Sequence, residues 1–128
     1  MLAGMAGIAD LMNRDVVAVA PEDTLGEAAA KMTEMGIGAV VVSDFGRMIG
    51  ILSERDIMRA VADRVHSSEA RVREWMTADP VTATTETSVE EAGRTMLENG
   101  FRHLPVVDGE RAIGMLSIRD VAQHQLES

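Results

Sequence analysis

The sequence repeats itself at a fixed offset of 64 residues, without a gap. Between residues 10–58 and residues 74–122, eighteen aligned positions carry the same amino acid. So many identities in one ungapped register indicate a tandem duplication. Two copies are too few for a solenoid, so we expect a closed pair with pseudo-twofold symmetry, in which each repeat buries its apolar face against the other.

Each copy contains the same short motif at the point where an apolar strand leads into a helix-like stretch. The motif is Gly-x-Leu-Ser-x-Arg-Asp, at residues 50–56 and 114–120. One interpretation is a helix cap, in which the serine accepts a hydrogen bond from the amide three residues on and the aspartate returns one. The other is a ligand site at a helix N-terminus, where amides attract phosphate and a carboxylate binds vicinal ribose hydroxyls. The recurrence of the motif strengthens the second interpretation.

Composition excludes several classes of function. The 128 residues are 46% hydrophobic and 26% charged, which is typical of a globular chain with a core, either one compact body or two very small ones. The formal net charge of −9 opposes binding to nucleic acid. The absence of cysteine excludes disulfides and thiolate zinc sites, and His66, His103 and His124 lack metal-ligand spacing, so we expect no metal.

The longest charge-free stretch of the expected folded region is also too short to cross a membrane. It covers residues 35–43, whereas a spanning helix needs about 20 apolar residues. Residues 1–7 have no basic segment, are too short for a secretory signal, and read as a partly ordered lead-in. We therefore expect a cytoplasmic protein with no membrane partner.

Hydrophobic spacing and cap residues predict the elements of the first repeat. Residues 24–27 form a capping box, and Gly36 suits the C′ position of the helix between them. The repeat should contain, in order, a helical lead, a strand, a helix, a hairpin around 44–46 and a last helix, at residues 8–12, 16–19, 25–35, 38–43 with 48–52, and 53–66. The apolar face of the last helix should consist of Ile57, Met58, Val61 and Val65.

The second repeat follows the same plan. Its elements should be a lead at 72–76, a strand near Val81, a helix capped by 88–91 and ended by Gly100, a hairpin of 103–107 with 112–116, and a helix at 117–126. The fold class is therefore α+β, with two tandem β-α-β-β-α repeats packed sheet to sheet. The repeats are expected at residues 8–66 and 72–126, with a linker at 67–71.

Two further motifs carry a resemblance to a known family. They are Met-Thr-x-Asp-Pro-Val at 76–81 and Gly-Phe-Arg-His-Leu-Pro-Val-Val at 100–107. With the repeat length and the doubled Ser-x-Arg-Asp motif, the chain resembles a pair of cystathionine beta-synthase (CBS) domains over residues 8–126, a Bateman module of the stand-alone bacterial type. The resemblance implies a regulatory protein, with no obligatory cofactor, that binds AMP, ADP or ATP in clefts between its two domains. The alternative ligands are S-adenosylmethionine and NADH.

The resemblance also implies which residues bind. The ribose carboxylates would be Asp56 and Asp120, with Ser53 and Ser117 near phosphate or ribose. The phosphate would be bound by Arg102 and His103, and within reach of Arg55 and Arg119. The walls around adenine would come from Val16, Val17, Gly38, Ala39, Val40, Pro80, Val81, Leu104 and Pro105. Because Gly38 and Ala39 replace the basic pair in the first repeat, we expect the stronger phosphate site to use Asp120.

Three functions compete. The first is regulation, in which a nucleotide shifts the packing of the repeats and so acts on an unidentified protein partner. The second is a ligand-free structural or protein-interaction module, and the third is an enzyme, which we reject because no P-loop and no nucleophile beside a base can be proposed.

Amphipathic helices with Met-rich faces predict a homodimer, and Trp75 should pack against the second repeat or a dimer mate. Carboxylates that occur singly predict that magnesium is not essential.

Overall fold

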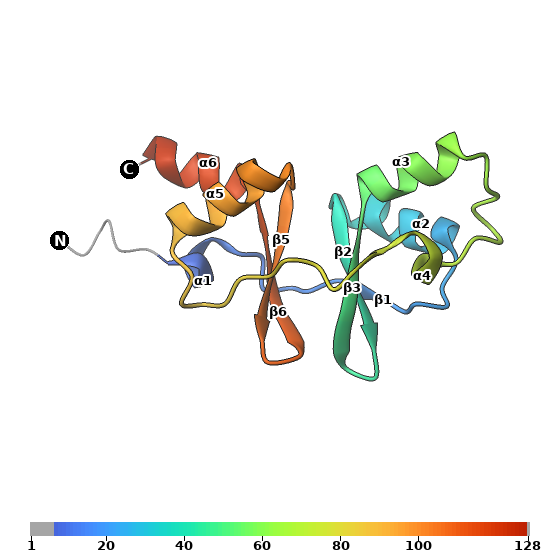
Figure 1. The fold of residues 1–128 in the computed structure, drawn as a ribbon, viewed down its shortest axis with the longest axis horizontal. Coiled ribbons are helices and arrows are strands. Elements are labelled where there is room, and N and C mark those ends of the chain that lie inside the picture. The colour runs from blue at the N-terminus through green and yellow to red at the C-terminus, as the bar shows by residue number, and fades with distance from the viewer. Residues whose placement is uncertain (1–6, 128) are drawn as a thin grey trace. The chain divides into compact units, whose positions relative to one another are not determined.

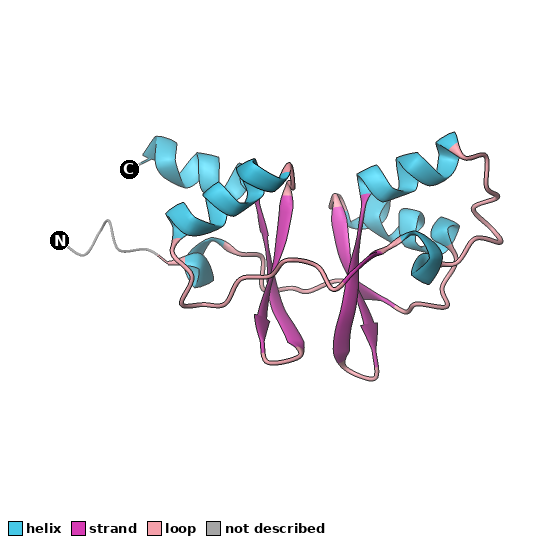
Figure 2. Ribbon diagram, viewed as in Figure 1, coloured by secondary structure: helices cyan, strands magenta, loops and turns pink. Residues whose placement is uncertain are grey.

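The computed structural model describes residues 7–127, so the lead-in expected at residues 1–6 lies outside the described residues. The chain forms two compact units. One unit is Val17–Pro80, and the other joins the described residues up to Val16 with those from Val81 onward. In each unit the helices pack on one face of a sheet (Figure 2). The predicted α+β class with two β-α-β-β-α-like repeats is confirmed, although the first strand of the second repeat is not formed.

The unit Val17–Pro80 contains a four-stranded sheet. Its strands, in spatial order, are β1 (Ala18–Val19), β2 (Ala39–Asp44), β3 (Arg47–Ser53) and β4 (Thr77–Ala78). β1 is parallel to β2, and the other pairs are antiparallel. Its helices are α2 (Leu25–Met35), α3 (Glu54–Ala62) and α4 (Val72–Trp75).

Alternation along β2 and helical spacing along α2 build the core of this unit. Val40 and Val42 point to the same face of β2 and are fully buried. Against them pack side chains from α2, β3, α3 and α4, chiefly Leu25, Ala28, Met32, Leu52, Ala60 and Val72. α2 begins and ends where its sequence predicts, with a capping box between Thr24 and Glu27 and a left-handed Gly36.

The other unit contains a single hairpin covered by helices. Its elements are α1 (Ile8–Leu11), α5 (Val89–Asn99), β5 (His103–Asp108), β6 (Arg111–Ser117) and α6 (Ile118–Glu127). β5 and β6 are antiparallel. The core joins Met96 from α5 and Leu116 from β6 with Val121 from α6. These elements agree with the predicted ones to within one residue.

The short leads α1 and α4 pack on the body of the other sequence repeat. α1 lies against β6 and α6 (Figure 1), and its Ile8 and the following Met12 are buried in the core of that unit. Asn13 and Met115 exchange backbone hydrogen bonds of 2.9 and 3.0 Å. In turn, Val72 of α4 is buried in the core of Val17–Pro80. The compact units therefore differ from the sequence repeats in which lead they contain.

The strand predicted near Val81 is wrong. In the first repeat the amide of Val41 donates to the carbonyl of Val17 at 3.0 Å, which extends the parallel pairing of β1 with β2. The residue equivalent to Val41 is Pro105, which has no N–H to donate to Val81. Only an isolated bridge between Ala83 and Val106 remains.

The last helix of the first repeat is shorter than predicted. It ends at Ala62 rather than about His66, because Arg64 adopts a left-handed conformation with φ of 62°. The amide of Arg64 donates to Val61 and that of Val65 to Ala60, which is a Schellman motif. The predicted apolar face is also partly wrong, since Met58 and Val61 are 70% and 66% exposed.

Candidate functional site

Both Ser-x-x-Asp motifs form reciprocal helix caps. The amide of Ser53 donates to Asp56 Oδ2 at 2.9 Å, and the amide of Asp56 donates to Ser53 Oγ at 3.3 Å. At the start of α6 the same two bonds join Ser117 and Asp120, at 3.0 and 3.1 Å. The capping interpretation is therefore confirmed. Each cap uses only one oxygen of its carboxylate for the backbone amide, so the caps do not decide against a ligand.

The start of each hairpin lies beside its cap. The amide of Ile118 donates to the carbonyl of Arg102 at 2.9 Å, and His103 is paired with Ser117 in the ladder of β5 with β6. One end of this hairpin thus brings together the predicted residues Arg102, His103, Ser117 and Asp120. Arg102 is exposed, and His103 and Asp120 are half-buried.

The first repeat has the same backbone arrangement without an arginine or a histidine at these positions. The amide of Glu54 donates to the carbonyl of Gly38 at 3.0 Å, and Ala39 is paired with Ser53. Asp56 is 5% exposed and is the one charged residue among the buried ones that the structure describes. Its Oδ1 accepts a hydrogen bond from Arg59 Nη2 at 2.8 Å. The two arginines that precede the carboxylates, Arg55 and Arg119, are exposed.

The residues predicted to surround adenine fall into three groups. Val40 and Leu104 are buried in the cores of their units, so that only their backbone could reach a ligand. Val17 lies beside β2 through its bond to Val41. Pro105, the third residue of β5, is also fully buried. The others lie at the points where the chain passes between units or where a strand begins, namely Val16, Pro80, Val81, Gly38 and Ala39.

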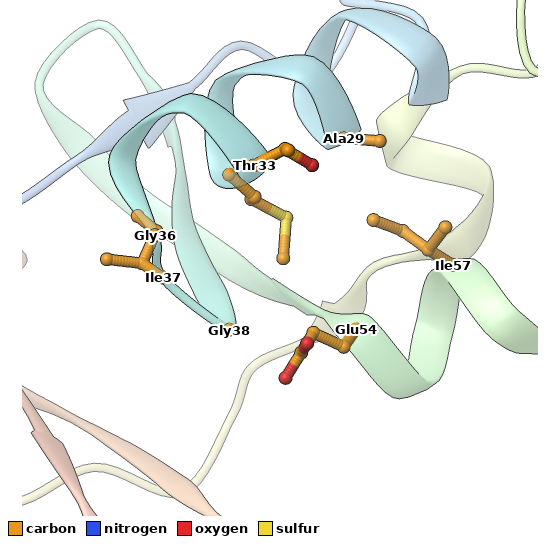
Figure 3. A pocket seen from close by; sticks show the side chains of 8 residues that line it. Ala29, Thr33, Gly36, Ile37, Gly38, Glu54 and Ile57 are labelled. Carbon is orange, nitrogen blue, oxygen red and sulfur yellow. The ribbon is translucent and has the colours of Figure 1, made fainter.

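A hollow of about 480 Å³ lies between α2 and α3 and was not predicted. Figure 3 shows Ala29 and Thr33 of α2 on one side, with Glu54 and Ile57 of α3 on the other. Gly38 also lines it and is the only lining residue that the sequence had suggested for binding. Its lining combines residues of α2 and α3 with the loop that follows α2. Hydrophobic periodicity predicts each helix by itself and does not show which residues of two helices face each other.

A second hollow lies beside the tryptophan. Trp75 lines a space of about 510 Å³ with Val65, His66 and Glu74 among others. Its side chain packs against the core of Val17–Pro80, so the prediction that it packs on the second repeat is wrong. The alternative, contact with a dimer mate, stays a prediction. The segment predicted as a linker is also held in place here, because Gly26 donates to Ser67 and Leu25 to Ala70 at 2.8 and 2.9 Å.

Comparison with known proteins identifies the family. A family model for the CBS domain matches residues 8–63 and again residues 72–127. The chain belongs to the CBS-domain family. A CBS domain-containing protein of Bacillus subtilis, YhcV, is 30% identical over 97% of this chain and 89% of its own length.

Solved structures of CBS-domain proteins match closely. A putative signal-transduction protein from Burkholderia ambifaria is 33% identical, with a TM-score of 0.90 and 96% of each chain covered. The CBS domain protein PAE2072 from Pyrobaculum aerophilum, solved in complex with AMP, is 28% identical with a TM-score of 0.86, covering 95% of this chain and 97% of that one.

The described residues contain neither a metal-binding cluster nor a helix that could span a membrane. They contain no cluster of three or more histidine, aspartate or glutamate side chains arranged to hold a metal ion. Within residues 7–127, no helix is long and apolar enough to cross a membrane.

Proposed function

We propose that this CBS pair is a regulatory module that binds an adenosine nucleotide of the AMP, ADP or ATP class and signals to a protein partner by a conformational shift. The observation that carries the proposal is the grouping of Arg102, His103, Ser117 and Asp120 at one end of the β5–β6 hairpin. A relative that is 28% identical binds AMP. The proposal makes the chain a sensor and not an enzyme.

The chemistry of this group fits a nucleotide. The amide of Ser117 donates to Oδ2 of Asp120, so the cap leaves Oδ1 to accept from the vicinal hydroxyls of ribose. The first amides of α6 and the side chains of Arg102 and His103 suit a phosphate. Because the whole chain carries a net charge of −9, these local cations matter more than they would on a neutral protein.

Thermal unfolding with a panel of ligands tests the proposal. AMP, ADP and ATP should stabilise the protein by RT ln(1 + [L]/Kd), about 2.7 kcal/mol at a hundredfold excess over Kd. S-adenosylmethionine and NADH belong in the panel as the alternative adenosine ligands, and CMP as a control for the base. The stabilisation should be strongly reduced in Asp120→Ala, which keeps only the weaker first site. If no adenosine compound at millimolar concentration raises the midpoint, the proposal is wrong.

A second candidate is a ligand-free module that serves only protein interaction. It is favoured by the caps themselves, since both aspartates already stabilise a helix and need no ligand to account for them. This function predicts that Asp120→Ala lowers the midpoint of the free protein while no nucleotide changes it.

A further inference from the structure

The two aspartates differ in the hydrogen bonds that their carboxylate oxygens accept. Asp56 Oδ1 accepts from Arg59 Nη2 at 2.8 Å, and Oδ2 accepts from both the amide and the hydroxyl of Ser53, at 2.9 and 3.1 Å. Asp120 Oδ2 accepts from the amide of Ser117, at 3.0 Å. Both oxygens of the first carboxylate are therefore engaged within its own helix turn, whereas the second carboxylate has no guanidinium at the spacing of Arg59.

The cause is a single difference between the repeats. The residue equivalent to Arg59 is Gln123, at the same i,i+3 spacing from its aspartate. Gln123 Nε2 lies 3.5 Å from Glu127 Oε2, further along α6 and away from the cap. Arg59 instead turns back toward the first turn of α3, and its Nη2 also lies 3.4 Å from the carbonyl of Trp75. The end of α4 therefore gives the guanidinium a second point of attachment.

We propose that Arg59 is an internal competitor for the carboxylate of Asp56, so that the first repeat discriminates against adenosine ligands while the second accepts them. The inference rests on the proposed function and names the residue that makes its two sites unequal. Both vicinal hydroxyls of a ribose donate hydrogen bonds to the carboxylate that binds them. Because Asp56 Oδ2 already accepts from the amide and the hydroxyl of Ser53, a ribose needs Oδ1, the oxygen that Arg59 occupies. The side chain of Asp56 is 8% exposed, so a ligand has little access to its carboxylate while Arg59 stays in place.

The test isolates the first site in an Asp120→Ala background. Calorimetry compares Asp120→Ala with the double variant Asp120→Ala, Arg59→Gln, which gives the first repeat the side chain of the second. Adenosine is the main probe, because it carries no phosphate that a cation could attract. Affinity should rise by up to about fivefold when Arg59 is replaced, the range set by the strength of a half-exposed ion pair.

The reciprocal exchange is the matched control. In an Asp56→Ala background, Gln123→Arg should weaken adenosine binding at the second site by a similar factor, because the new guanidinium can reach Asp120 at the same spacing. Chemical denaturation of each variant without ligand confirms that it is folded. A measurement that needs no change at Arg59 is the salt dependence of adenosine binding by Asp120→Ala, which should become tighter as salt screens the ion pair.

The possible results separate the two proposals. If the wild-type protein binds adenosine or AMP but replacement of Arg59 leaves the first site unchanged or weaker, the competition is wrong and the proposed function stands. Adenosine binding by Asp120→Ala that weakens with salt would contradict the competition in the same way. If neither the wild-type protein nor any variant binds an adenosine compound, the proposed function is overturned, and this inference with it.

Discussion

Gly50 and Met76 are in such close contact that a β-carbon on Gly50 would lie 2.8 Å from the sulfur of Met76. The same atom would lie 2.8 Å from the carbonyl oxygen of Thr77. The glycine therefore allows the strand β4 to pair with β3. A β-carbon on its equivalent, Gly114, would have three atoms of the Met12 side chain as its nearest neighbours.

Gly50→Ala should lower the free energy of unfolding by about 1–3 kcal/mol, because the backbone of Thr77 cannot move away without breaking the pairing. Gly114→Ala should cost less, since a methionine side chain can change its rotamer. Urea denaturation of the two variants measures the difference. An equal or reversed order would show that the contact with Thr77 does not limit the packing.

Glu27 should contribute to the pH dependence of stability. Its pKa is lowered from its ordinary value because the backbone amide of Thr24 donates a hydrogen bond to its carboxylate, with a smaller effect from the Thr24 side chain. A lowered pKa in the folded state means that the contribution is present above the ordinary value and is lost as the pH falls through the lowered one. Glu27→Gln should therefore make the acid decline in stability less steep.

The matched control for Glu27 is Glu91, at the equivalent position of α5. Its amide donates to Ser88 Oγ at 3.0 Å, but among the described residues no bond from the Ser88 amide to its carboxylate is found. Glu91→Gln removes the same charge from the first turn of a helix without removing a hydrogen bond of this kind, so the comparison isolates the effect of the bond to Thr24. A similar change of slope in both variants would assign the effect to overall charge.

Arg102→Ala should weaken AMP binding about tenfold to a hundredfold, because a charge-assisted bond to phosphate contributes about 1.5–3 kcal/mol. Adenosine binding should change little, since adenosine lacks the phosphate. Arg94→Ala, which removes an exposed charge from α5, is the control for net charge. Calorimetry with both ligands decides the matter, and equal losses for AMP and adenosine would place Arg102 away from the phosphate.

Magnesium should not be required for AMP binding. The predicted carboxylates, Asp56 and Asp120, occur singly, and each already accepts the hydrogen bond that caps its helix. We therefore expect Arg102, through a charge-assisted hydrogen bond, to neutralise the phosphate in place of a metal ion. Affinity measured with excess EDTA should equal that measured with millimolar magnesium. A large loss in EDTA would mean that a metal, and not Arg102 and His103, neutralises the phosphate.

We expect the protein to form a homodimer through the outer face of its helices. Met58 and Val61 lie one turn apart on α3 and are 70% and 66% exposed. Replacing both with glutamate should shift the sedimentation coefficient to that of a monomer. Phe45, fully exposed at the tip of the β2–β3 turn, supplies the control variant Phe45→Ser, which should stay dimeric. A wild-type monomer at tens of micromolar would contradict the prediction.

Much of the fold could be predicted because its signals are local. The capping box at Thr24, the left-handed Gly36 and the turn before Gly46 each depend on neighbours within four residues. The placement of α1 and α4 could not be predicted, since the bond between Asn13 and Met115 joins residues that no periodicity connects. The absence of a strand near Val81 could have been predicted, because Pro105 lacks the N–H that the pairing needs.

For the candidate site, the caps were predictable and the difference between them was missed. Ser53 with Asp56 and Ser117 with Asp120 follow from a short motif. The pairing of Arg59 with Asp56 had a signal, since opposite charges three residues apart on a helix lie side by side. The sequence does not show which way such a side chain turns, because that depends on the carbonyl of Trp75, which the fold brings to it.

The placement of the short leads α1 and α4, each on the body of the other sequence repeat, bears on the origin of the duplication. A gene encoding one repeat would produce a body and an opening helix that packs elsewhere, because here α1 and α4 place their buried residues, Ile8 and Val72, in the core built by the opposite repeat. Two copies of that ancestor, trading their opening helices, would complete both cores. Fusion of the two genes in tandem would then join an assembly that already existed. Such a history accounts for a duplication in which the bounds of the sequence repeats differ from the bounds of the compact units.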